Sequence, residues 1–389
     1  MRILYHHRTR GRDVEGVHIR GVVGALRGLG HEVGVMSFPG ADPEQEQVAG
    51  TARPSGRSRL GALVSRMPGV LFEALELGYN LVTLVRMRRA FARFAPQLVY
   101  ERYSLFLFAT VWLARRRGIP VILEINDSAL VERVRPLRLK SLARRIERWC
   151  LRHATGLVFI SSYFQQQAAA AYGDIAPAVV SPNAADLARF DPALHDRERL
   201  RAERGVAGRV VCGYVGAFVH WHGVNGFVEA VAARLAEAPE LVLLLVGDGR
   251  SLPEVRALVQ AHGLADRILL PGRVPHHEIP AWIACMDYAV LPDSNRYGSP
   301  VKLFEFMAMG VAMVAPDYAP VAEVVSDGET GWLFPRRQLP ACVQRVLELA
   351  TRPAERQRVG AAARAYIVRE RQWRNNAEQL LGLLPEVQP

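Results

Sequence analysis

The sequence predicts two α/β domains, each built on a parallel, doubly wound β-sheet. Strand-like and helix-like segments alternate along all 389 residues. The strand-like segments are nearly continuous apolar runs, which is typical of parallel strands covered by helices on both faces. The alternation is interrupted at 181–192 (SPNAADLARFDP), where turn residues and a proline end the first set of units. Half of the residues are hydrophobic, which is enough for two large cores.

Eleven strands are expected from these apolar runs. Six belong to the first domain, at 3–6, 32–37, 98–101, 121–125, 156–160 and 178–181. Five belong to the second domain, at 210–215, 241–246, 268–270, 288–291 and 311–315. Helical stretches separate most of them, as the crossover connections of a parallel sheet require. The segment after the last strand is read as a short helix followed by a turn.

The net charge of +11 belongs to the first half of the chain. Residues 1–185 carry 26 basic and 14 acidic residues, and the remainder carries 23 and 24. Two segments, 57–94 and 132–149, mix arginines with apolar residues and are expected to form basic amphipathic helices. Such helices indicate an interface with an anionic membrane or an acidic ligand, and a solvated arginine-rich face is the alternative. The basic half lacks nucleic-acid motifs, so nucleic acid is not an expected partner.

The cysteines and the apolar runs bear on the compartment. The four cysteines are isolated and have no metal-ligand spacing, which favours reduced thiols in a cytoplasmic protein. Met1 runs directly into a strand-like segment, so no signal peptide is expected. No charge-free apolar run reaches the roughly 18 residues of a spanning helix. We therefore expect a cytoplasmic protein, peripheral on the inner face of the cytoplasmic membrane if the basic helices bind lipid; the sequence indicates no oligomeric state.

The most informative segment is 298–334, which begins with a predicted helix. Ser299 is expected at its N-cap and Pro300 at its first position. The helix core, LFEFMAM, is apolar nearly all round and therefore predicted to be buried, yet it carries Glu305, with Lys302 in the first turn. Lys302 is one of only two lysines among 49 basic residues. The dipole at a helix N-terminus disfavours a lysine, and an unpaired buried carboxylate is costly.

Both charges are explained if a ligand with phosphates and hydroxyl groups binds at this helix N-terminus. Free backbone N–H groups and Lys302 would hold the phosphates, and Glu305 would accept hydrogen bonds from a ribose. The alternative is that Lys302 bends back to solvent and Glu305 pairs with an arginine.

Several motifs, taken in order, resemble those of retaining glycosyltransferases of family 4. They are EGVHIRGVVGALRGLGHEV, YERYSLF, VVSPNAADLARF, YVGAFVHWHGV, LLLVGDG, LPGRVPHHEIPAWIACMDYAVLP and SPVKLFEFMAMG. The resemblance implies the GT-B fold, in which two Rossmann-like domains face each other across a cleft. It implies an acceptor-binding domain at 1–185 and a nucleotide-sugar-binding domain at 186–365. Residues 366–389 are then expected to cross back to the first domain, with a helix at about 366–384.

The resemblance also implies roles for individual residues. The second glutamate of the family motif is Glu305, which would bind the ribose, and the first is replaced by Tyr297. The family's arginine and lysine after the first strand of the second domain are replaced by Ala217 and His222, so Lys302 would supply the missing charge and His222 a donor. Asn126 stands where a histidine often faces the transferred sugar. The remaining donor-binding positions are Glu15, Gly16, Gly216, Arg273, Val274, Gly298, Ser299, Pro300 and Val301.

The expected reaction is transfer of a sugar from a UDP- or GDP-sugar to an acceptor hydroxyl with retention of configuration. The basic helices suggest a lipid-linked acceptor or a polysaccharide or glycolipid precursor, and a soluble small molecule is the alternative. No cofactor and no metal are expected, because no Asp-x-Asp pair suited to a divalent ion is present. Two other hypotheses are a nucleotide-sugar 2-epimerase of the GT-B fold and an inactive sugar- or nucleic-acid-binding module.

Overall fold

The computed structural model describes all residues except 10, 12, 39–40, 43–67, 132–134 and 386–389. The chain forms two compact units. The first comprises Met1–Pro182 together with Trp373–Pro389, and the second comprises Asn183–Gln372. The units therefore divide after residue 182 rather than after 185, and the chain rejoins the first unit at 373 rather than at 366.

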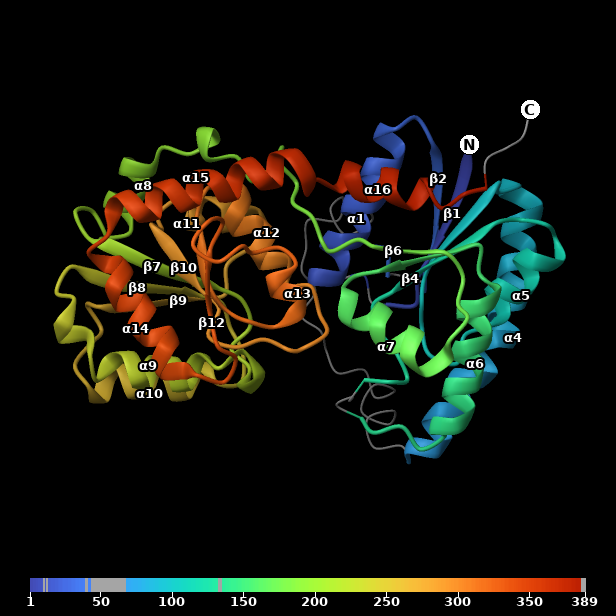
Figure 1. The fold of residues 1–389 in the computed structure, drawn as a ribbon, viewed down its shortest axis with the longest axis horizontal. Coiled ribbons are helices and arrows are strands. Elements are labelled where there is room, and N and C mark those ends of the chain that lie inside the picture. The colour runs from blue at the N-terminus through green and yellow to red at the C-terminus, as the bar shows by residue number, and fades with distance from the viewer. Residues whose placement is uncertain (10, 12, 39–40, 43–67, 132–134, 386–389) are drawn as a thin grey trace. The chain divides into compact units, whose positions relative to one another are not determined.

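A six-stranded, all-parallel sheet forms the centre of the first unit (Figure 1). Its order is β2-β1-β3-β4-β5-β6, so the chain builds β2 on one side of β1 and all later strands on the other. The connection therefore reverses direction between β1 and β3, which is where ligands bind in sheets of this kind. The strands are β1 (Arg2–His6), β2 (Glu32–Met36), β3 (Leu98–Arg102), β4 (Val121–Ile125), β5 (Gly156–Phe159) and β6 (Ala178–Val180).

Helices cover both faces of this sheet, as the fully buried strand β4 requires. The last helix of the chain, α16, packs against α1. A Cβ atom added at Gly21 of α1 would overlap the ring of Trp373, so this close contact needs a glycine. The helices of the first unit are α1 (Asp13–Gly28), α4 (Gly69–Phe94), α5 (Ala109–Arg116), α6 (Lys140–His153), α7 (Ser162–Tyr172) and α16 (Trp373–Leu381).

The second unit has its own six-stranded parallel sheet, in the order β12-β11-β10-β7-β8-β9. Strands β8 and β9 extend the sheet on one side of β7, and β10 to β12 extend it on the other. The connection therefore reverses between β7 and β10. The strands are β7 (Val210–Val215), β8 (Leu241–Val246), β9 (Ile268–Gly272), β10 (Tyr288–Val290), β11 (Met313–Pro316) and β12 (Trp332–Phe334).

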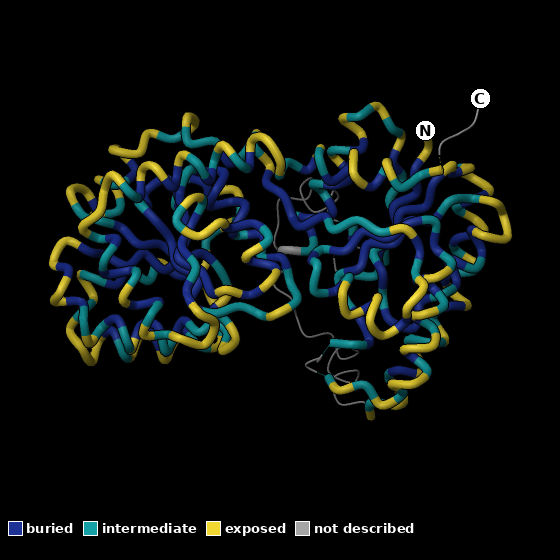
Figure 2. The backbone as a smooth tube through the Cα atoms, viewed as in Figure 1, coloured by how far each residue is buried: buried dark blue, intermediate teal, exposed yellow. Residues whose placement is uncertain are grey.

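Eight α-helices lie in the second unit, all of whose residues are described, and they cover its sheet on both sides (Figure 1). In Figure 2 most of the backbone at the centre of this unit is dark blue, and exposed residues lie along the outer helix faces. Strands β8, β10 and β11 are buried along their whole length, whereas the edge strand β9 is not, so the core follows the centre of the sheet. The helices are α8 (Arg197–Glu203), α9 (Val224–Ala232), α10 (Leu252–Ala261), α11 (Ile279–Ile283), α12 (Val301–Ala308), α13 (Ala319–Ala322), α14 (Leu339–Ala350) and α15 (Pro353–Glu370). Four 3₁₀ turns complete the unit, at Pro192–Leu194, His220–His222, Leu235–Glu237 and His276–Glu278.

Two features of the second sheet differ from the prediction. Strand β11 begins at Met313 and not at residue 311, because the N–H of Val311 donates to the carbonyl of Phe306 and closes the end of helix α12. Gly310, at φ 71°, supplies the left-handed residue of that helix end. The prediction also missed β12, a three-residue edge strand that follows a turn and is too short to show an apolar period.

The expected single helix at about 366–384 is instead two helices, α15 and α16. The chain is extended between them, where Gln372 forms a β-bridge with Ala185, and the carbonyl of Arg371 accepts a hydrogen bond from the N–H of Ala185. Because Arg371 and Gln372 make these contacts with Ala185, they are not helical and separate α15 from α16.

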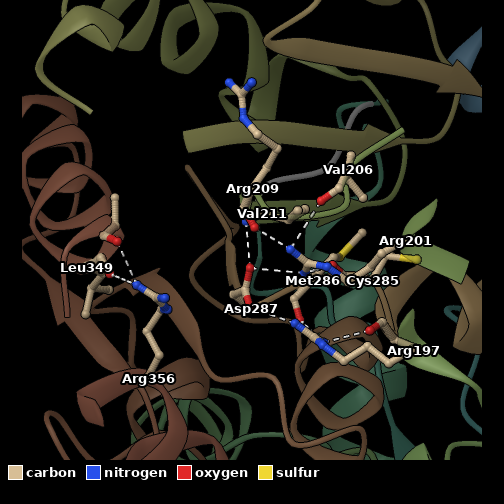
Figure 3. A network of polar contacts seen from close by, with 12 residues as sticks. Arg197, Arg201, Val206, Arg209, Val211, Cys285, Met286, Asp287, Leu349 and Arg356 are labelled. Carbon is tan, nitrogen blue, oxygen red and sulfur yellow. Dashed lines mark hydrogen bonds and ion pairs between the residues drawn. The ribbon is translucent and has the colours of Figure 1, made fainter. Parts of the chain in front are cut away.

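A network of arginines fastens helix α8 to the amino-terminal side of the second sheet (Figure 3). Arg197 and Arg201 both form ion pairs with Asp287, at 2.6 and 3.2 Å, and both donate to backbone carbonyls of 284–286. Asp287 in turn accepts a hydrogen bond of 2.7 Å from the N–H of Val211 in β7. The network joins α8 to the starts of β7 and β10 and thereby stabilises the unit. It does not involve the carboxyl-terminal ends of these strands.

Of the two basic segments, 57–94 is helical over Gly69–Phe94 and 132–149 contributes the start of α6. Residues 57–67 and 132–134 lie outside the described residues. None of the helices in the described part of the chain has the length and apolarity needed to span a bilayer.

Candidate active site

The carboxyl-terminal ends of β7 and β10 bring together Gly216 and Lys302, two of the residues selected from the sequence. Gly216 follows β7 directly, and Lys302 lies in the first turn of α12, which follows β10. Gly216 has φ 152°, and a Cβ atom there would overlap Nζ of Lys302. The side chain of Lys302 therefore lies at the switch point of the sheet, the place between β7 and β10 where the chain connection reverses. It can lie there because Gly216 has no Cβ atom.

Lys302 is half-buried and lies against Tyr214 of β7. Its Nζ is 4.5 Å from the centre of the tyrosine ring and donates a hydrogen bond of 3.3 Å to Tyr214 Oη. Among the described residues, no carboxylate lies within ion-pair distance of Nζ. Burial lowers the pKa of Lys302 to about 7, although the charge of Glu305 acts in the opposite direction. An anion bound beside Nζ would restore the charged form.

His222 completes this group from the 3₁₀ turn after β7. Its Nδ1 lies 2.8 Å from the carbonyl oxygen of Ala217 and 3.0 Å from Tyr214 Oη. Since a carbonyl only accepts, we assign the proton of the neutral ring to Nδ1. Burial and then the charge of Lys302 lower the pKa of His222 to about 4. The ring is therefore neutral and its Nε2 is an acceptor, so it donates to a phosphate only after taking up a proton.

The loop before α12 differs in detail from the prediction. The helix begins at Val301, with Pro300 at the N-cap, one residue later than expected. Ser299 does not cap it, because its Oγ accepts a hydrogen bond of 3.0 Å from the N–H of Asn183, and its carbonyl accepts one of 2.6 Å from Asn183 Nδ2. The N-terminus of α12 has no side-chain cap. The first-turn N–H groups of Val301 and Lys302 are thus placed to bind an anion.

Tyr297 and Gly298 do not offer their backbone amides in the same way. Both N–H groups donate to Oδ1 of Asn295, at 3.1 and 2.5 Å. The N–H of Gly298 is therefore occupied within this loop, and a role of its backbone in donor binding stays a prediction. Asn295 and Asn183 shape the loop, and the sequence prediction had not selected either of them as site residues.

Glu305 is buried, and its partner is a histidine instead of the arginine considered as the alternative. Oε1 of Glu305 lies 3.0 Å from Nε2 of His276, in the segment that follows β9. The other ring nitrogen of His276, Nδ1, is buried without a hydrogen-bond partner. A carboxylate only accepts, so we assign Nε2 as the donor of this hydrogen bond. His276 was missed because a single histidine in a loop carries no local signal of its partner.

Arg273 and Val274 follow β9, in the same loop as His276. Arg273 is exposed, and Val274 packs against the core of the second unit. Both lie at the carboxyl-terminal end of a strand, and their role in donor binding stays a prediction.

The candidate residues of the first unit gather at the ends of its own central strands. Asn126 follows β4 and donates a hydrogen bond of 3.2 Å to Oε1 of Glu124. Glu124 is completely buried and also accepts from Arg102, His18 and Tyr100, at 2.5, 2.7 and 2.8 Å. Burial would raise its pKa, but the charges of His18 and Arg102 outweigh burial and lower it to about 2. Glu124 is a further residue that the sequence prediction did not select.

Glu15 and Gly16 lie in the first turn of α1 and not in a free glycine loop. A Cβ atom at Gly16 would overlap the carbonyl oxygen of Gly11, so the glycine is required by the close approach of this backbone. Glu15 is half-buried, and its charge contributes to the raised pKa of Arg102. Among the described residues, no group of three or more His, Cys, Asp or Glu side chains is arranged to hold a metal ion.

Two parallel-sheet units, each with a polar site at its switch point, are the arrangement of nucleotide-sugar-dependent transferases of the GT-B type. Residues 15–184 match the family model "Glycosyl transferase 4-like domain", and residues 209–352 match "Glycosyl transferases group 1". The chain belongs to the group 1 glycosyltransferases with the GT-B fold.

Relatives and solved structures agree with this assignment. The chain is 28% identical to a 2-deoxystreptamine glucosyltransferase of Streptomyces kanamyceticus over 69% of its length and 72% of that protein. It is 27% identical to a GDP-mannose-dependent alpha-(1-6)-phosphatidylinositol monomannoside mannosyltransferase of Mycolicibacterium smegmatis, over 59% of the chain and 61% of that protein. The structure of Anabaena HepE in complex with UDP matches with a TM-score of 0.75 at 18% identity, covering 98% of this chain and 99% of that one, which shows the fold.

Proposed function

We propose that this protein transfers a sugar from a UDP- or GDP-sugar to an acceptor hydroxyl with retention of anomeric configuration. The observation that carries the proposal is the position of Lys302. Its half-buried amine lies beside the uncapped N-terminus of α12, with no carboxylate in ion-pair distance among the described residues, so a bound anion would hold it in the charged form. A diphosphate is the group that complements this arrangement.

In the proposed reaction the bond between the anomeric carbon and the diphosphate oxygen breaks. The bond from that carbon to the acceptor oxygen forms on the same face, and the acceptor proton passes to the leaving diphosphate. Lys302 and the first N–H groups of α12 stabilise the negative charge that develops on this leaving group. Glu305 accepts hydrogen bonds from the ribose, and Asn126 hydrogen-bonds a sugar hydroxyl without moving a proton.

The proposal includes transfer without a divalent metal, since Lys302 would take the place of the ion at the diphosphate. Full turnover after exhaustive treatment with a chelator is the expected result. Loss of turnover that is restored by magnesium or manganese would contradict this part of the proposal.

For the acceptor, we propose a lipid-linked sugar or glycolipid precursor at the inner face of the cytoplasmic membrane. The excess of positive charge in the first half of the chain supports this choice. Among the relatives, the mannosyltransferase is described for a phosphatidylinositol monomannoside and the glucosyltransferase for 2-deoxystreptamine. A soluble acceptor is thus the competing possibility. The relatives described above are glycosyltransferases, so neither a 2-epimerase nor an inactive module is favoured.

The test is thermal unfolding of the protein and of Lys302→Met with a panel of nucleoside diphosphates and their sugars. A ligand at about 100 times its dissociation constant stabilises the folded state by roughly 2.7 kcal/mol, which shifts the melting temperature visibly. We expect a shift with UDP or GDP that is much reduced in Lys302→Met. No shift with any nucleotide at saturation would overturn the proposal. Retention is then tested by nuclear magnetic resonance of the product's anomeric configuration.

A further inference from the structure

The first part of helix α4, over residues 70–85, has its polarity reversed relative to an ordinary surface helix. In this part the fully buried side chains are the polar ones, Glu73, Asn80 and Thr83, whereas the last turns bury Met87 and Phe91 in the usual way. The opposite side of this first part carries large apolar side chains that are 48–70% exposed: Val70, Leu71, Leu75, Leu81, Val82 and Val85. A surface helix of a soluble protein normally shows the opposite pattern, so the exposed apolar face of α4 indicates a partner.

The buried polar residues explain how the helix is held in this orientation. The two carboxylate oxygens of Glu73 accept hydrogen bonds of 2.7 and 2.6 Å from the N–H groups of Arg138 and Leu139, just before α6. Oδ1 of Asn80 accepts hydrogen bonds of 2.9 and 3.0 Å from the N–H groups of Phe108 and Ala109, at the start of α5. Rotating α4 to bury its leucines would break all four bonds, so the exposure of the apolar face is built into the fold.

The apolar face continues into a basic one along the same side of the helix. Arg88, Arg89 and Arg93 are exposed and follow Val70, Leu71 and Leu75 by 18 residues, which is five complete turns. The neighbouring helix α6 exposes Lys140, Arg144, Arg145 and Arg148. The three carboxylates of α4 and α6 do not offset this charge at the surface: Glu73 and Glu147 are buried, and Glu76 is partly exposed but forms an ion pair with Arg8.

We propose that the apolar face of α4, continued by Arg88, Arg89 and Arg93 on the same side of the helix, docks onto an anionic lipid bilayer, with the basic residues of α6 adding to the positive charge of this unit. Apolar side chains would enter the acyl boundary while the arginines and Lys140 meet the lipid phosphates. The charge argues against a second copy of the chain as the occupant. The start of α6, with Lys140, lies next to the N-terminal end of α4, and the arginines lie at its C-terminal end. Parallel or antiparallel pairing of two α4 helices therefore brings positive charge against positive charge.

The docking itself does not depend on the chemistry of the transfer. Its consequence, that the acceptor is carried by a lipid, rests on the proposed function. It deepens that proposal by naming the surface that would bring the site to a membrane-borne acceptor.

The test is co-sedimentation of the full chain with vesicles of phosphatidylcholine, with and without phosphatidylglycerol, in the absence of donor and acceptor. We expect binding to anionic vesicles only, and weaker binding as salt is raised. Leu75→Gln/Leu81→Gln should bind at least roughly tenfold more weakly, because each leucine loses its burial in the acyl boundary. Arg88→Gln/Arg89→Gln should lose about fivefold for each arginine removed.

Matched controls use exposed residues of the second unit. Leu194 is 65% exposed, so Leu194→Gln replaces an exposed leucine that lies outside the proposed docking surface. Arg199→Gln likewise removes an exposed positive charge outside that surface. Both are expected to bind vesicles like the unaltered protein. Light scattering on the same protein samples measures the oligomeric state. It therefore tests the alternative that a second copy of the chain covers the apolar face of α4. The proposal is overturned if the protein fails to bind anionic vesicles at low salt, if Leu75→Gln/Leu81→Gln binds normally, or if that variant dissociates a dimer. Nucleotide binding, measured by calorimetry on the same samples, reports separately on the transferase site.

Discussion

Nε2 of His276 donates a hydrogen bond of 3.0 Å to Oε1 of the buried carboxylate of Glu305. The two residues come from different connections of the second sheet, the loop after β9 and helix α12. His276 also packs edge-on against Phe190, with ring centres 6.1 Å apart. The histidine thus holds one carboxylate oxygen of Glu305. Under the proposed function, in which Glu305 binds the ribose, His276 acts as a positioning residue for that carboxylate.

Replacing His276 is expected to weaken nucleotide binding. A hydrogen bond to a charged group contributes about 1.5–3 kcal/mol, so His276→Ala should raise the dissociation constant of the preferred nucleoside diphosphate roughly 10- to 100-fold. His276→Gln keeps an N–H donor and should recover part of this loss. Isothermal calorimetry measures both. His277→Ala, at the exposed neighbouring histidine, is the control and should bind normally; equal affinities for all variants would remove His276 from the site.

Nucleotide affinity is expected to fall with rising pH because of Lys302. Its pKa is about 7 in the free protein, and a bound diphosphate favours the protonated form. Between about pH 7 and about pH 9 binding must therefore take up a proton, and the dissociation constant should rise by up to roughly tenfold per pH unit. Calorimetry in buffers of different ionisation enthalpy detects that proton. Lys302→Met should bind weakly and with little pH dependence over this range.

The same lysine makes a prediction for stability. Its pKa is lowered on folding, so between about pH 7 and about pH 10 the unfolded chain holds a proton that the folded protein lacks. The contribution of Lys302 to the free energy of unfolding therefore increases as pH rises through this window. Denaturant unfolding should show a steeper rise with pH for the unaltered protein than for Lys302→Met. Identical slopes would mean that Lys302 is not desolvated.

Gly216→Ala is expected to displace Lys302. The added Cβ would overlap Nζ of the lysine, and φ 152° is a strained backbone for alanine. We expect a stability loss of about 1–3 kcal/mol together with at least tenfold weaker nucleotide binding. Gly263→Ala separates the two effects, because Gly263 also has a positive φ, 64°, but nothing within 4 Å of its Cβ position. That variant should lose stability and keep its affinity; loss of affinity in both would indicate a general effect of unfolding.

Glu124→Gln is expected to destabilise the first unit by about 3 kcal/mol or more, because it leaves His18 and Arg102 without their buried counter-charge. The pKa of Glu124 is lowered on folding, from 4.5 to about 2. Its contribution is therefore complete above about pH 5 and is lost as pH falls toward about 2. Chemical unfolding as a function of pH tests both statements. The control is Glu237→Gln, at an exposed ion pair with Arg234, which should leave stability unchanged.

The sequence was sufficient to predict features that depend on residues close together in the chain. Apolar runs located all of the first sheet and five of the six strands of the second, because a strand buried on both faces must be apolar along its length. Lys302 and Glu305 could be selected because charges inside an apolar helix are costly without a ligand or a partner. The family motifs then led to the same two domains.

The tertiary structure alone decided which residues complete the sites. His276 meets Glu305 across 29 residues, Asn183 holds Ser299 across 116, and Glu124 gathers His18 from 106 residues away. Such partners leave no trace in local spacing, because the chain folds between them. The orientation of α4 has the same cause. Its sequence shows apolar residues and arginines, but the hydrogen bonds of Glu73 to the segment before α6 and of Asn80 to the start of α5 determine which face is left exposed.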